Sequence, residues 1–548
     1  MITRTWIVVA ACALLAPESA GQGRLAGGVH TDKVNGFSVR VPSKWEMVPV
    51  TIDEKWMVGK YISHRDYSNK GGGYAVSHRP NMKVMVFSAE KLKDREKRET
   101  VGNTTYVSSN KVFRNYKDYL REYMKGQSLG YHIADEKQTE VGGLPVTQIR
   151  AVAKTDWTSY VYITWIYDRR EDGMTIAVQF DALEDRFSTL NKDFMKSLRS
   201  FRFIERTAEA SSEDLENPMW TRDRSKWSKL KPEERIRIRR DLEERRRARY
   251  IETAPEGWFT MTSRKGDYVA LSHADKKYTQ TVLATADAMR AWMDKHFGDI
   301  SDEYVMTGII RICKDVDEYR SYRDTSASAG ARSFSTEDRE IVDFKDVNAG
   351  TSGGGLGTLA GGLKDNYIFD KDALLYGYMP LWVSTGLDRY FQSGVLKGRS
   401  LSFKVGTWEK VAIKEAKREG QLVSLQDIMT RTRYEWPSDR NEAYRYLAQV
   451  VGAIRFLVDG PGKRDKLLKG YLPKLMKATI PAAEAWRKES PAEGQAQTEE
   501  EEEARAREGN LRWKKARRFV LDRVNAECCD FTDKEWAKLN KLFERYLK

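Results

Sequence analysis

Short stretches in which apolar and polar residues alternate dominate the first 200 residues. Four of them are bounded by turn residues and predict strands of an antiparallel sheet, at residues 37–41, 83–87, 160–166 and 174–180. Two further stretches, 112–124 and 185–198, show helical spacing, and in the second one the apolar residues Phe187, Leu190, Phe194 and Leu198 recur every three or four positions. Residues 30–205 therefore predict one α+β domain whose helices cover the sheet.

From residue 256 to 480 the pattern becomes mainly helical. Strand patterns occur only near its beginning, at 259–262, 268–272 and 305–313. The first helix pattern, 276–297, places Val282, Ala286, Met289 and Met293 on one face. Further helices are expected at 373–391, 425–430 and 442–458. The sequence thus predicts a second domain over 256–480, largely helical with a small N-terminal sheet.

Two charged segments flank this second domain. Residues 206–255 predict a charged helical linker: positions 231–250 hold nine basic and five acidic residues, and Pro232 suits a first helical turn. Ile238 and Leu242 give this helix a narrow apolar stripe, so it is either a solvated spacer or docks on a neighbour. Residues 481–548 predict a charged linker with an acidic run at 499–503, then C-terminal helices. Thr532 and Glu535 form a capping box there, with Phe531 and Trp536 as a hydrophobic staple.

Composition and charge narrow the class of protein. The chain has 548 residues, which suggests about three folded units with linkers. Its 15 Trp, 26 Tyr and 19 Phe exceed what disordered chains carry. The net charge of +14 comes from 94 Lys and Arg against 80 Asp and Glu, a surface dense in both signs that implies no nucleic-acid partner. The composition also excludes a multi-span membrane protein, a collagen-like fibre and a disulfide-dense scaffold.

The N-terminus predicts export. A basic start at Arg4, an apolar run at 6–16 and small residues up to Ala20 are typical of a secretory signal peptide, residues 1–20, cleaved near Ala20. The run is shorter than the roughly 20 residues that cross a bilayer, and no comparable run follows, so we expect no transmembrane span. The expected location is secreted or periplasmic. A lipid anchor at Cys12 is the less favoured alternative.

Cleavage near Ala20 would leave three cysteines, Cys313, Cys528 and Cys529. Cys528 or Cys529 could pair with Cys313 or with a second chain, and unpaired thiols are the simplest alternative.

Few residues point to catalysis. A zinc peptidase helix needs two histidines one turn apart, but the six histidines here lie at least 14 residues from one another: His30, His64, His78, His132, His273 and His296. Ser352 lies in a Gly-x-Ser-x-Gly pattern, yet no histidine follows His296 as the α/β-hydrolase order requires; an order of His273, an aspartate and Ser352 stays open. Glycines at 355–357 imitate a dinucleotide loop, but no helix pattern opens after them. We expect no metal and no cofactor.

The first domain resembles the PsbP-like family. The resemblance covers about 170 residues and rests on Asn35–Pro42 with Trp45, the Gly142–Pro145 turn, and the closing segment Phe194–Phe203. It implies an accessory module that binds or assembles larger complexes, with no catalytic signature.

The second domain resembles the gluzincin metallopeptidases. The stretch MPLWVSTGLDRYF at 379–391 is similar to the Trp-Leu-x-Glu-Gly helix of that family, and its surroundings extend the resemblance over about 220 residues. The family's glutamate on this helix is the third zinc ligand, and Thr385 occupies that position here. The paired-histidine helix is expected within 365–378, where no histidine occurs. The resemblance therefore implies a degenerate scaffold, a pseudopeptidase. An alternative explanation is that Trp382, Leu387 and Phe391 are simply the buried face of a helix.

Together these observations predict an exported, non-catalytic binding or scaffold protein with an unknown protein or peptide partner in the envelope. No residue is expected to be catalytic. The residues of the vestigial cleft are Asp372, Tyr376, Trp382, Thr385 and Asp388. Three alternatives stay open: a secreted peptidase with unusual metal ligands such as Asp370 or Asp372, a serine hydrolase using Ser352, and a protein that binds anionic envelope polymers.

Overall fold

The computed structural model describes residues 24–547 except for 27, 52–53, 71–75, 90–95, 102–103, 110–112, 125–128, 170–172, 208–226, 228, 253, 299–302, 325–333, 336–338, 346–356, 432–434, 461–464, 490–510, 512–514, 516–517 and 523–528. Several sequence-based predictions lie outside the described residues: the signal peptide, Cys12, Ser352, the acidic run 499–503 and Cys528. The chain forms two compact units. One comprises 1–216, 248–256 and 320–329, and the other 217–247, 257–319 and 330–548.

The first unit is built on a seven-stranded antiparallel sheet with the strand order β11-β12-β13-β14-β8-β5-β4. Its strands are β4 (Trp45–Val48), β5 (Met57–Ser63), β8 (Asn81–Phe87), β11 (Tyr131–Val141), β12 (Leu144–Lys154), β13 (Ser159–Arg169) and β14 (Met174–Leu183). A four-stranded sheet contains β1 (Arg24–Ala26), β2 (Val29–Asp32), β3 (Phe37–Arg40) and β15 (Arg202–Phe203). Two hairpins complete the unit: β6 (Tyr67–Ser68) with β7 (Ser77–His78), and β9 (Glu96–Val101) with β10 (Thr104–Ser109). The predicted antiparallel sheet is confirmed.

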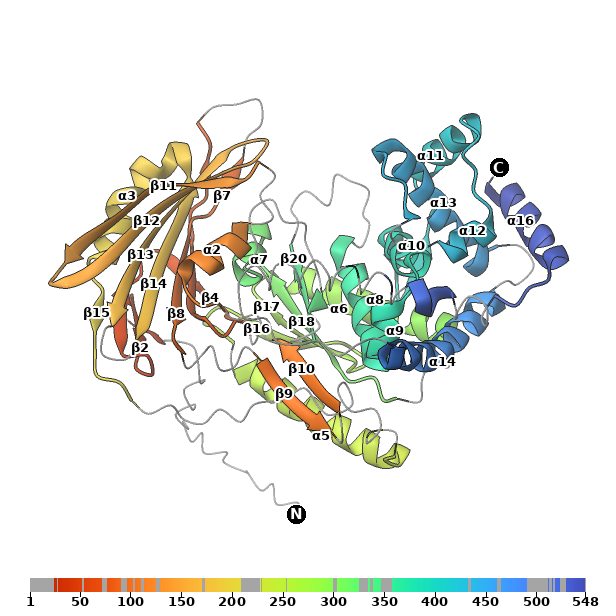
Figure 1. Ribbon diagram of the computed structural model, residues 1–548, viewed down its shortest axis with the longest axis horizontal. Helices are drawn as coiled ribbons and strands as arrows, with labels where there is room; N and C mark the ends of the chain where they lie inside the picture. Colours follow the sequence, from red (N-terminus) through yellow and green to blue (C-terminus); the bar gives the residue numbers. More distant parts are fainter. Residues whose placement is uncertain are drawn as a thin grey trace, which may run out of the picture. The chain divides into compact units, whose positions relative to one another are not determined.

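One helix covers each face of the large sheet (Figure 1). Alternate residues of a strand point to opposite faces, so Val84 and Val86 of β8 face one core while Met85 and Phe87 face the other. Helix α3 (Glu184–Leu198) closes the first core with the predicted apolar residues Phe187, Leu190, Phe194 and Leu198. Helix α2 (Tyr116–Met124) closes the second core with Tyr116, Tyr119, Leu120 and Met124. The α+β prediction for this part of the chain is confirmed.

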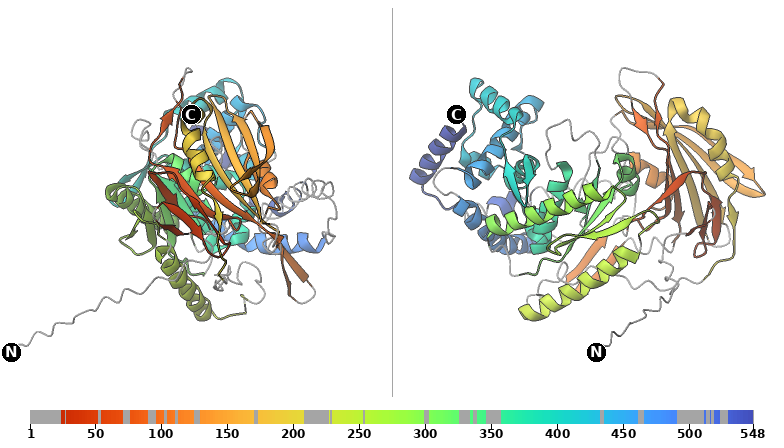
Figure 2. Two further views of the ribbon diagram at one scale, coloured as in Figure 1. Left: turned by 90° about the vertical axis from the view of Figure 1, so that its left-hand side faces the viewer. Right: turned by 180° about the vertical axis from the view of Figure 1, so that it is seen from behind.

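The second unit begins with a five-stranded mixed sheet of order β16-β17-β18-β20-β19, in which β17, β18 and β20 are parallel. Its strands are β16 (Phe259–Thr262), β17 (Tyr268–Ser272), β18 (Gly308–Cys313), β19 (Phe334–Ser335) and β20 (Glu340–Phe344). Helices α6 (Lys276–Phe297) and α8 (Gly357–Lys371) contact each other and this sheet (Figure 2). All four apolar residues predicted for α6 are buried in this core.

Most of the remaining second unit is helical. Its other elements are α5 (Pro232–Glu252, whose last five residues fall in the first unit), α7 (Val316–Tyr322, which spans the division at 319/320), α9 (Ala373–Tyr378), α10 (Leu381–Gln392), β21 (Gly394–Lys397), β22 (Ser400–Phe403), α11 (Thr407–Arg418), α12 (Leu425–Thr430), α13 (Arg440–Val458), α14 (Asp465–Glu489) and α16 (Asp533–Leu547). None of the helices in the described part of the chain combines the length and apolarity needed to cross a membrane.

Two sequence-based predictions about this unit are wrong. A helix does open after the glycine-rich stretch, because α8 starts at Gly357 and runs to Lys371. Glycine is a poor helix former, but tertiary packing of Leu359, Leu363 and Tyr367 into the core outweighs that preference. The predicted continuous helix 373–391 is two helices, α9 and α10, because Pro380 lacks an N–H and serves as the N-cap of α10.

Helix α5 is docked on the second unit through its first sixteen residues. Pro232 occupies its first turn as predicted, and Leu242 and Ile238 pack in a small cluster with Met306 and Tyr304. The docking alternative for the apolar stripe is therefore confirmed, and the solvated spacer is wrong for this helix.

The C-terminal helix α16 forms as the sequence indicates. Thr532 Oγ1 accepts from the Glu535 amide at 3.3 Å, and Glu535 Oε2 accepts from the Thr532 amide at 2.9 Å. The Phe531 and Trp536 rings meet edge to face, with centroids 4.9 Å apart. The capping box and the staple are both confirmed.

One buried histidine makes the stability of the first unit depend on pH. His30 is fully buried against Tyr61, whose hydroxyl lies 2.6 Å from Nδ1, and burial lowers the pKa of His30 from 6.5 to about 4, against the opposing charge of Asp32. The unfolded chain therefore binds one more proton than the folded chain between pH 6.5 and about 4. Stability present above pH 6.5 is lost as the pH falls through this window, by about 3 kcal/mol in total.

We predict that His30→Phe flattens the pH dependence of the urea midpoint of this unit between pH 4 and pH 6.5. The matched control is His132→Gln on the exposed edge strand β11, which should leave the slope as in the wild type. Tryptophan fluorescence during urea unfolding measures both. An unchanged slope in His30→Phe would show that another group carries the pH dependence.

Candidate functional site

The predicted site residues lie on two consecutive helices of the second unit, α9 and α10. Asp372 is the N-cap of α9, where its Oδ1 accepts from the Leu375 amide at 2.7 Å. Tyr376, one turn along α9, packs edge to face on Phe369 with centroids 5.5 Å apart. Thr385 and Asp388 lie on α10, both half-buried. Trp382 is buried in the core against the ring of Tyr471.

A lysine that sequence reasoning missed organises the junction of α8 and α10. Lys364 is buried on α8, and its Nζ lies 2.7 Å from Asp388 Oδ1 and 3.0 Å from Asp365 Oδ1. The same ammonium donates to the Ser384 carbonyl oxygen at 3.0 Å. Three oxygens from two helices thus surround one fixed cation. We call Lys364, Asp365 and Asp388 the α8–α10 cluster.

Burial and neighbouring charge act in opposite directions on the pKa values of Lys364 and Asp365. Burial alone would lower the pKa of Lys364, but the carboxylates of Asp365 and Asp388 outweigh it, and the pKa of Lys364 is raised. Burial raises the pKa of Asp365, although the charge of Lys364 opposes that rise. The ammonium is therefore firmly protonated, and it balances much of the negative charge beside it.

Asp370, a candidate ligand in the peptidase alternative, is held in a separate ion-pair centre. Its Oδ1 accepts from Arg339 Nη2 at 2.6 Å, and its Oδ2 accepts from the Met306 amide at 2.7 Å and from Arg239 Nη1 at 3.4 Å. Arg239 Nη2 also donates to the Asp370 carbonyl oxygen at 2.9 Å. Burial lowers the pKa of Arg339 to about 10, against the charge of Asp370. Two guanidinium groups and an amide already occupy this carboxylate.

The histidine considered for a serine hydrolase lies at the carboxyl end of β17. His273 Nδ1 is 2.6 Å from Oε1 of Glu318, a fully buried carboxylate, and its ring stacks on Trp258 with centroids 5.3 Å apart. Ser352, the nucleophile in the serine hydrolase alternative, lies outside the described residues. The described residues therefore supply a histidine–carboxylate pair but leave the nucleophile untested.

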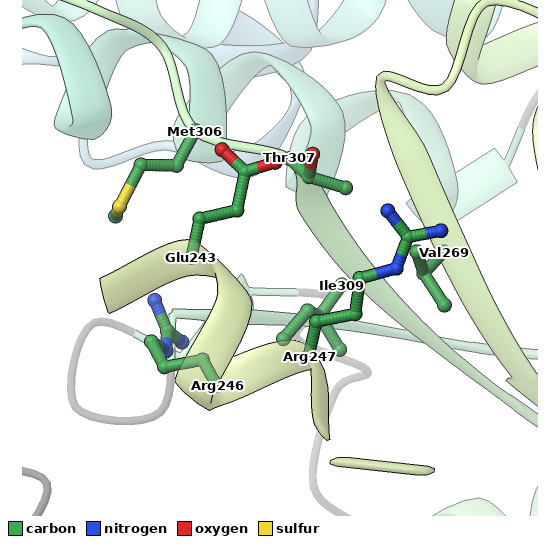
Figure 3. A pocket seen from close by; sticks show the side chains of 7 residues that line it. All are labelled: Glu243, Arg246, Arg247, Val269, Met306, Thr307 and Ile309. Atoms are coloured by element: carbon green, nitrogen blue, oxygen red, sulfur yellow. Dashed lines mark hydrogen bonds between the residues drawn. The ribbon is translucent and has the colours of Figure 1, made fainter. Parts of the chain in front are cut away.

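A small pocket lies on the other side of the mixed sheet, under α5 (Figure 3). Glu243, Arg246 and Arg247 of α5 line it together with Val269 and Ile309 of the sheet, and Glu243 points toward Thr307. The Thr307 hydroxyl donates to Glu243 beside it. The cavity measures about 10 Å³, which is at the lower limit for a single water molecule, so it holds no substrate.

Comparison with solved structures gives similarity to the N-terminal third of the chain. No known family model matches the chain, and no curated protein matches it. Among solved structures, the solution structure of cyanobacterial PsbP from Synechocystis sp. PCC 6803 is similar at 14% identity and a TM-score of 0.22, covering 33% of this chain and 98% of that one. LpqN of Mycobacterium tuberculosis, described as involved in cell envelope biogenesis, matches at 12% identity and a TM-score of 0.20, covering 31% and 83%. The Ran-binding protein Mog1p of Saccharomyces cerevisiae matches at 10% identity and a TM-score of 0.20, covering 31% and 91%.

At these identities and TM-scores the matches carry no argument about function. Nothing in them supports a gluzincin-like domain over 256–480. The N-terminal third of the chain resembles the fold shared by PsbP, Mog1 and LpqN.

We predict that Lys364→Met destabilises the second unit by about 2 kcal/mol at pH 7, because it leaves two partly buried carboxylates facing each other. Without the ammonium, the repulsion between the two carboxylates is largest when both are ionised, so it weakens as the pH falls. The variant should therefore lose less stability at pH 4 than at pH 7.

Thermal unfolding followed by circular dichroism at both pH values tests this prediction. The triple variant Lys364→Met/Asp365→Asn/Asp388→Asn should regain most of the loss, and Lys534→Met on the exposed face of α16 is the control. A loss that is equal at both pH values would mean that packing, and not charge, explains the effect.

Proposed function

We propose that this chain is an exported binding or scaffold protein without hydrolytic activity, built on a degenerate metallopeptidase scaffold with a PsbP-like accessory module. The proposal rests on the resemblance of residues 379–391 to the third-ligand helix of gluzincins and on the position of Thr385 there. That segment is the helix α10, and Trp382, Leu387 and Phe391 form its buried face.

The α8–α10 cluster is the observation that carries the proposal. A gluzincin site surrounds Zn²⁺ with neutral imidazoles and a carboxylate, on helices that face each other. Here α8 packs against α10, as α13 also does, and α8 presents Lys364 to Asp388 at 2.7 Å. A Zn²⁺ ion about 4 Å from this ammonium would face a repulsion of about 8 kcal/mol at an effective dielectric constant of 20. The two nearby carboxylates are already paired with a cation that belongs to the chain.

The residue type at position 385 also disfavours zinc binding. The hydroxyl at Thr385 offers a neutral oxygen where the resemblance requires a carboxylate, and such an oxygen is a weak zinc ligand. Without bound metal, a scaffold of this class has no activated water, and hydrolysis by that route is lost. Binding through the surfaces of the two units is then the activity that the chain retains.

Metal analysis joined to a cleavage assay tests this proposal. We predict that the mature chain, purified without chelator, contains far less than one zinc per chain and does not cleave an unfolded protein substrate. Added zinc should leave its melting temperature unchanged, and a fluorophosphonate probe should not label it, which tests Ser352.

One zinc per chain together with chelator-sensitive cleavage would contradict the proposal. In that case Asp372→Asn, at a ligand of the peptidase alternative, should abolish cleavage, whereas Asp459→Asn should not, since Asp459 accepts from the Tyr390 hydroxyl at 3.1 Å and belongs to no candidate site. Labelling by the fluorophosphonate would favour the serine hydrolase instead.

A further inference from the structure

Exposed apolar side chains gather where α11 begins beside α13. Val405, Val411 and Tyr444 are 44%, 48% and 43% exposed, and Trp408 between them is half-buried. The Trp408 and Tyr444 rings lie 5.5 Å apart, joining the two helices. Val411 follows Trp408 by three residues on α11, and Val405 directly precedes the N-cap residue Gly406. We call these four residues the α11–α13 patch.

Buried polar groups anchor the start of α11, which carries Trp408, to α13. Glu409 Oε1 accepts from the Gly406 amide at 3.1 Å, and this buried carboxylate forms a two-point ion pair with Arg455 of α13, at 2.9 and 3.0 Å. The indole of Trp408 lies so close to Gly406 that a Cβ there would sit 2.9 Å from Cδ1. The start of α11, which carries Trp408, is therefore anchored to α13, and such preorganisation lowers the entropy cost of binding.

The surroundings of the patch are mainly basic. Lys404, Lys410, Lys414 and Arg440 are exposed next to it along the chain, and none of them makes an ion pair with a described residue. Three acidic residues also lie nearby: Asp439, which caps α13 and is exposed, Glu442, which is exposed, and Glu415, which is half-buried. A surface of this kind offers aromatic contact at its centre and a small excess of positive charge at its rim.

We propose that the α11–α13 patch is a docking surface for an acidic polypeptide segment of a partner protein, one that also carries aromatic or aliphatic side chains. Trp and Tyr supply much of the energy at protein interfaces, and the basic rim selects acidic neighbours of the anchoring side chains. A protein partner is favoured over a bilayer because Val405, Val411 and Tyr444 are each less than half exposed. Such side chains form a flat contact and do not reach deeply into lipid.

This inference goes beyond the proposed function by naming a surface and the chemistry of its partner. The patch is separate from the α8–α10 cluster, and its test reads binding only. Failure of one proposal therefore leaves the result for the other unchanged.

A labelled random copolymer of glutamate and tyrosine is a suitable probe. We predict that the full mature chain binds it saturably in fluorescence anisotropy, and that Val411→Glu and Lys410→Glu/Lys414→Glu each weaken binding about tenfold or more. Because the whole chain is basic, the charge control is Lys534→Glu/Lys538→Glu on the exposed face of α16. Trp157→Ala, 58% exposed in the first unit, is the aromatic control. Both controls should bind as the wild type does.

Several outcomes would overturn this inference. One is equal weakening by the α16 control, which would mean general charge attraction. Another is equally tight binding of polyglutamate without tyrosine, which would remove the aromatic contribution. Binding of phosphatidylglycerol vesicles with the same sensitivity to Val411→Glu would identify a membrane surface instead, and absence of saturable binding by the wild type would also reject the proposal. Circular dichroism of each variant confirms that loss of binding is not loss of fold.

Discussion

A single buried carboxylate, Asp370, holds the second unit together. It lies near the end of α8 and binds Arg239 of α5, Arg339 just before β20 and the amide of Met306 before β18. Removing it would take a carboxylate away from two buried guanidinium groups, and breaking a buried ion pair costs more than the pair itself contributes. The position of α5, of α8 and of the parallel strands therefore depends on this one group.

The same constraint explains why a helix as polar as α5 is docked and not solvated. Its apolar stripe is narrow, with Ile238 and Leu242 alone facing Met306 and Tyr304. Arg239 lies between these two residues and is buried, and it also lies 3.3 Å from Glu303. The ion pairs of Arg239 therefore add to a small hydrophobic contact. Neither interaction could be inferred from the number of basic residues at positions 231–250.

Sequence patterns predicted the elements whose stability is local. The spacing of Phe187 and Leu190 predicted α3 and its buried face, and the spacing of Val282 and Ala286 did the same for α6. Both predictions succeed because apolar residues that recur with helical periodicity lie on the buried side of a helix. The N-terminal cap of α16 could also be predicted from the sequence, because Thr532 and Glu535 interact within one turn of the chain. In contrast, α8 was missed because its glycines lower helix propensity, while the packing that offsets this loss comes from distant strands and helices.

Only part of the candidate site could be predicted from the sequence, because the other part depends on how two helices pack against each other. The motif around Thr385 and Asp388 marked α10, but the role of Lys364 depends on which helix faces it, and its residue type alone suggests a solvated side chain. Lys364 and Asp370 are six residues apart on α8, so they point about 120° apart around the helix. One side of α8 thus carries a cation that pairs with two carboxylates, and another carries a carboxylate that pairs with two arginines. In a metal-dependent scaffold the central charge is an exchangeable ion. In α8 the two groups at the centres of the ion-pair clusters are the side chains of Lys364 and Asp370, so the opposite charges come from the chain itself.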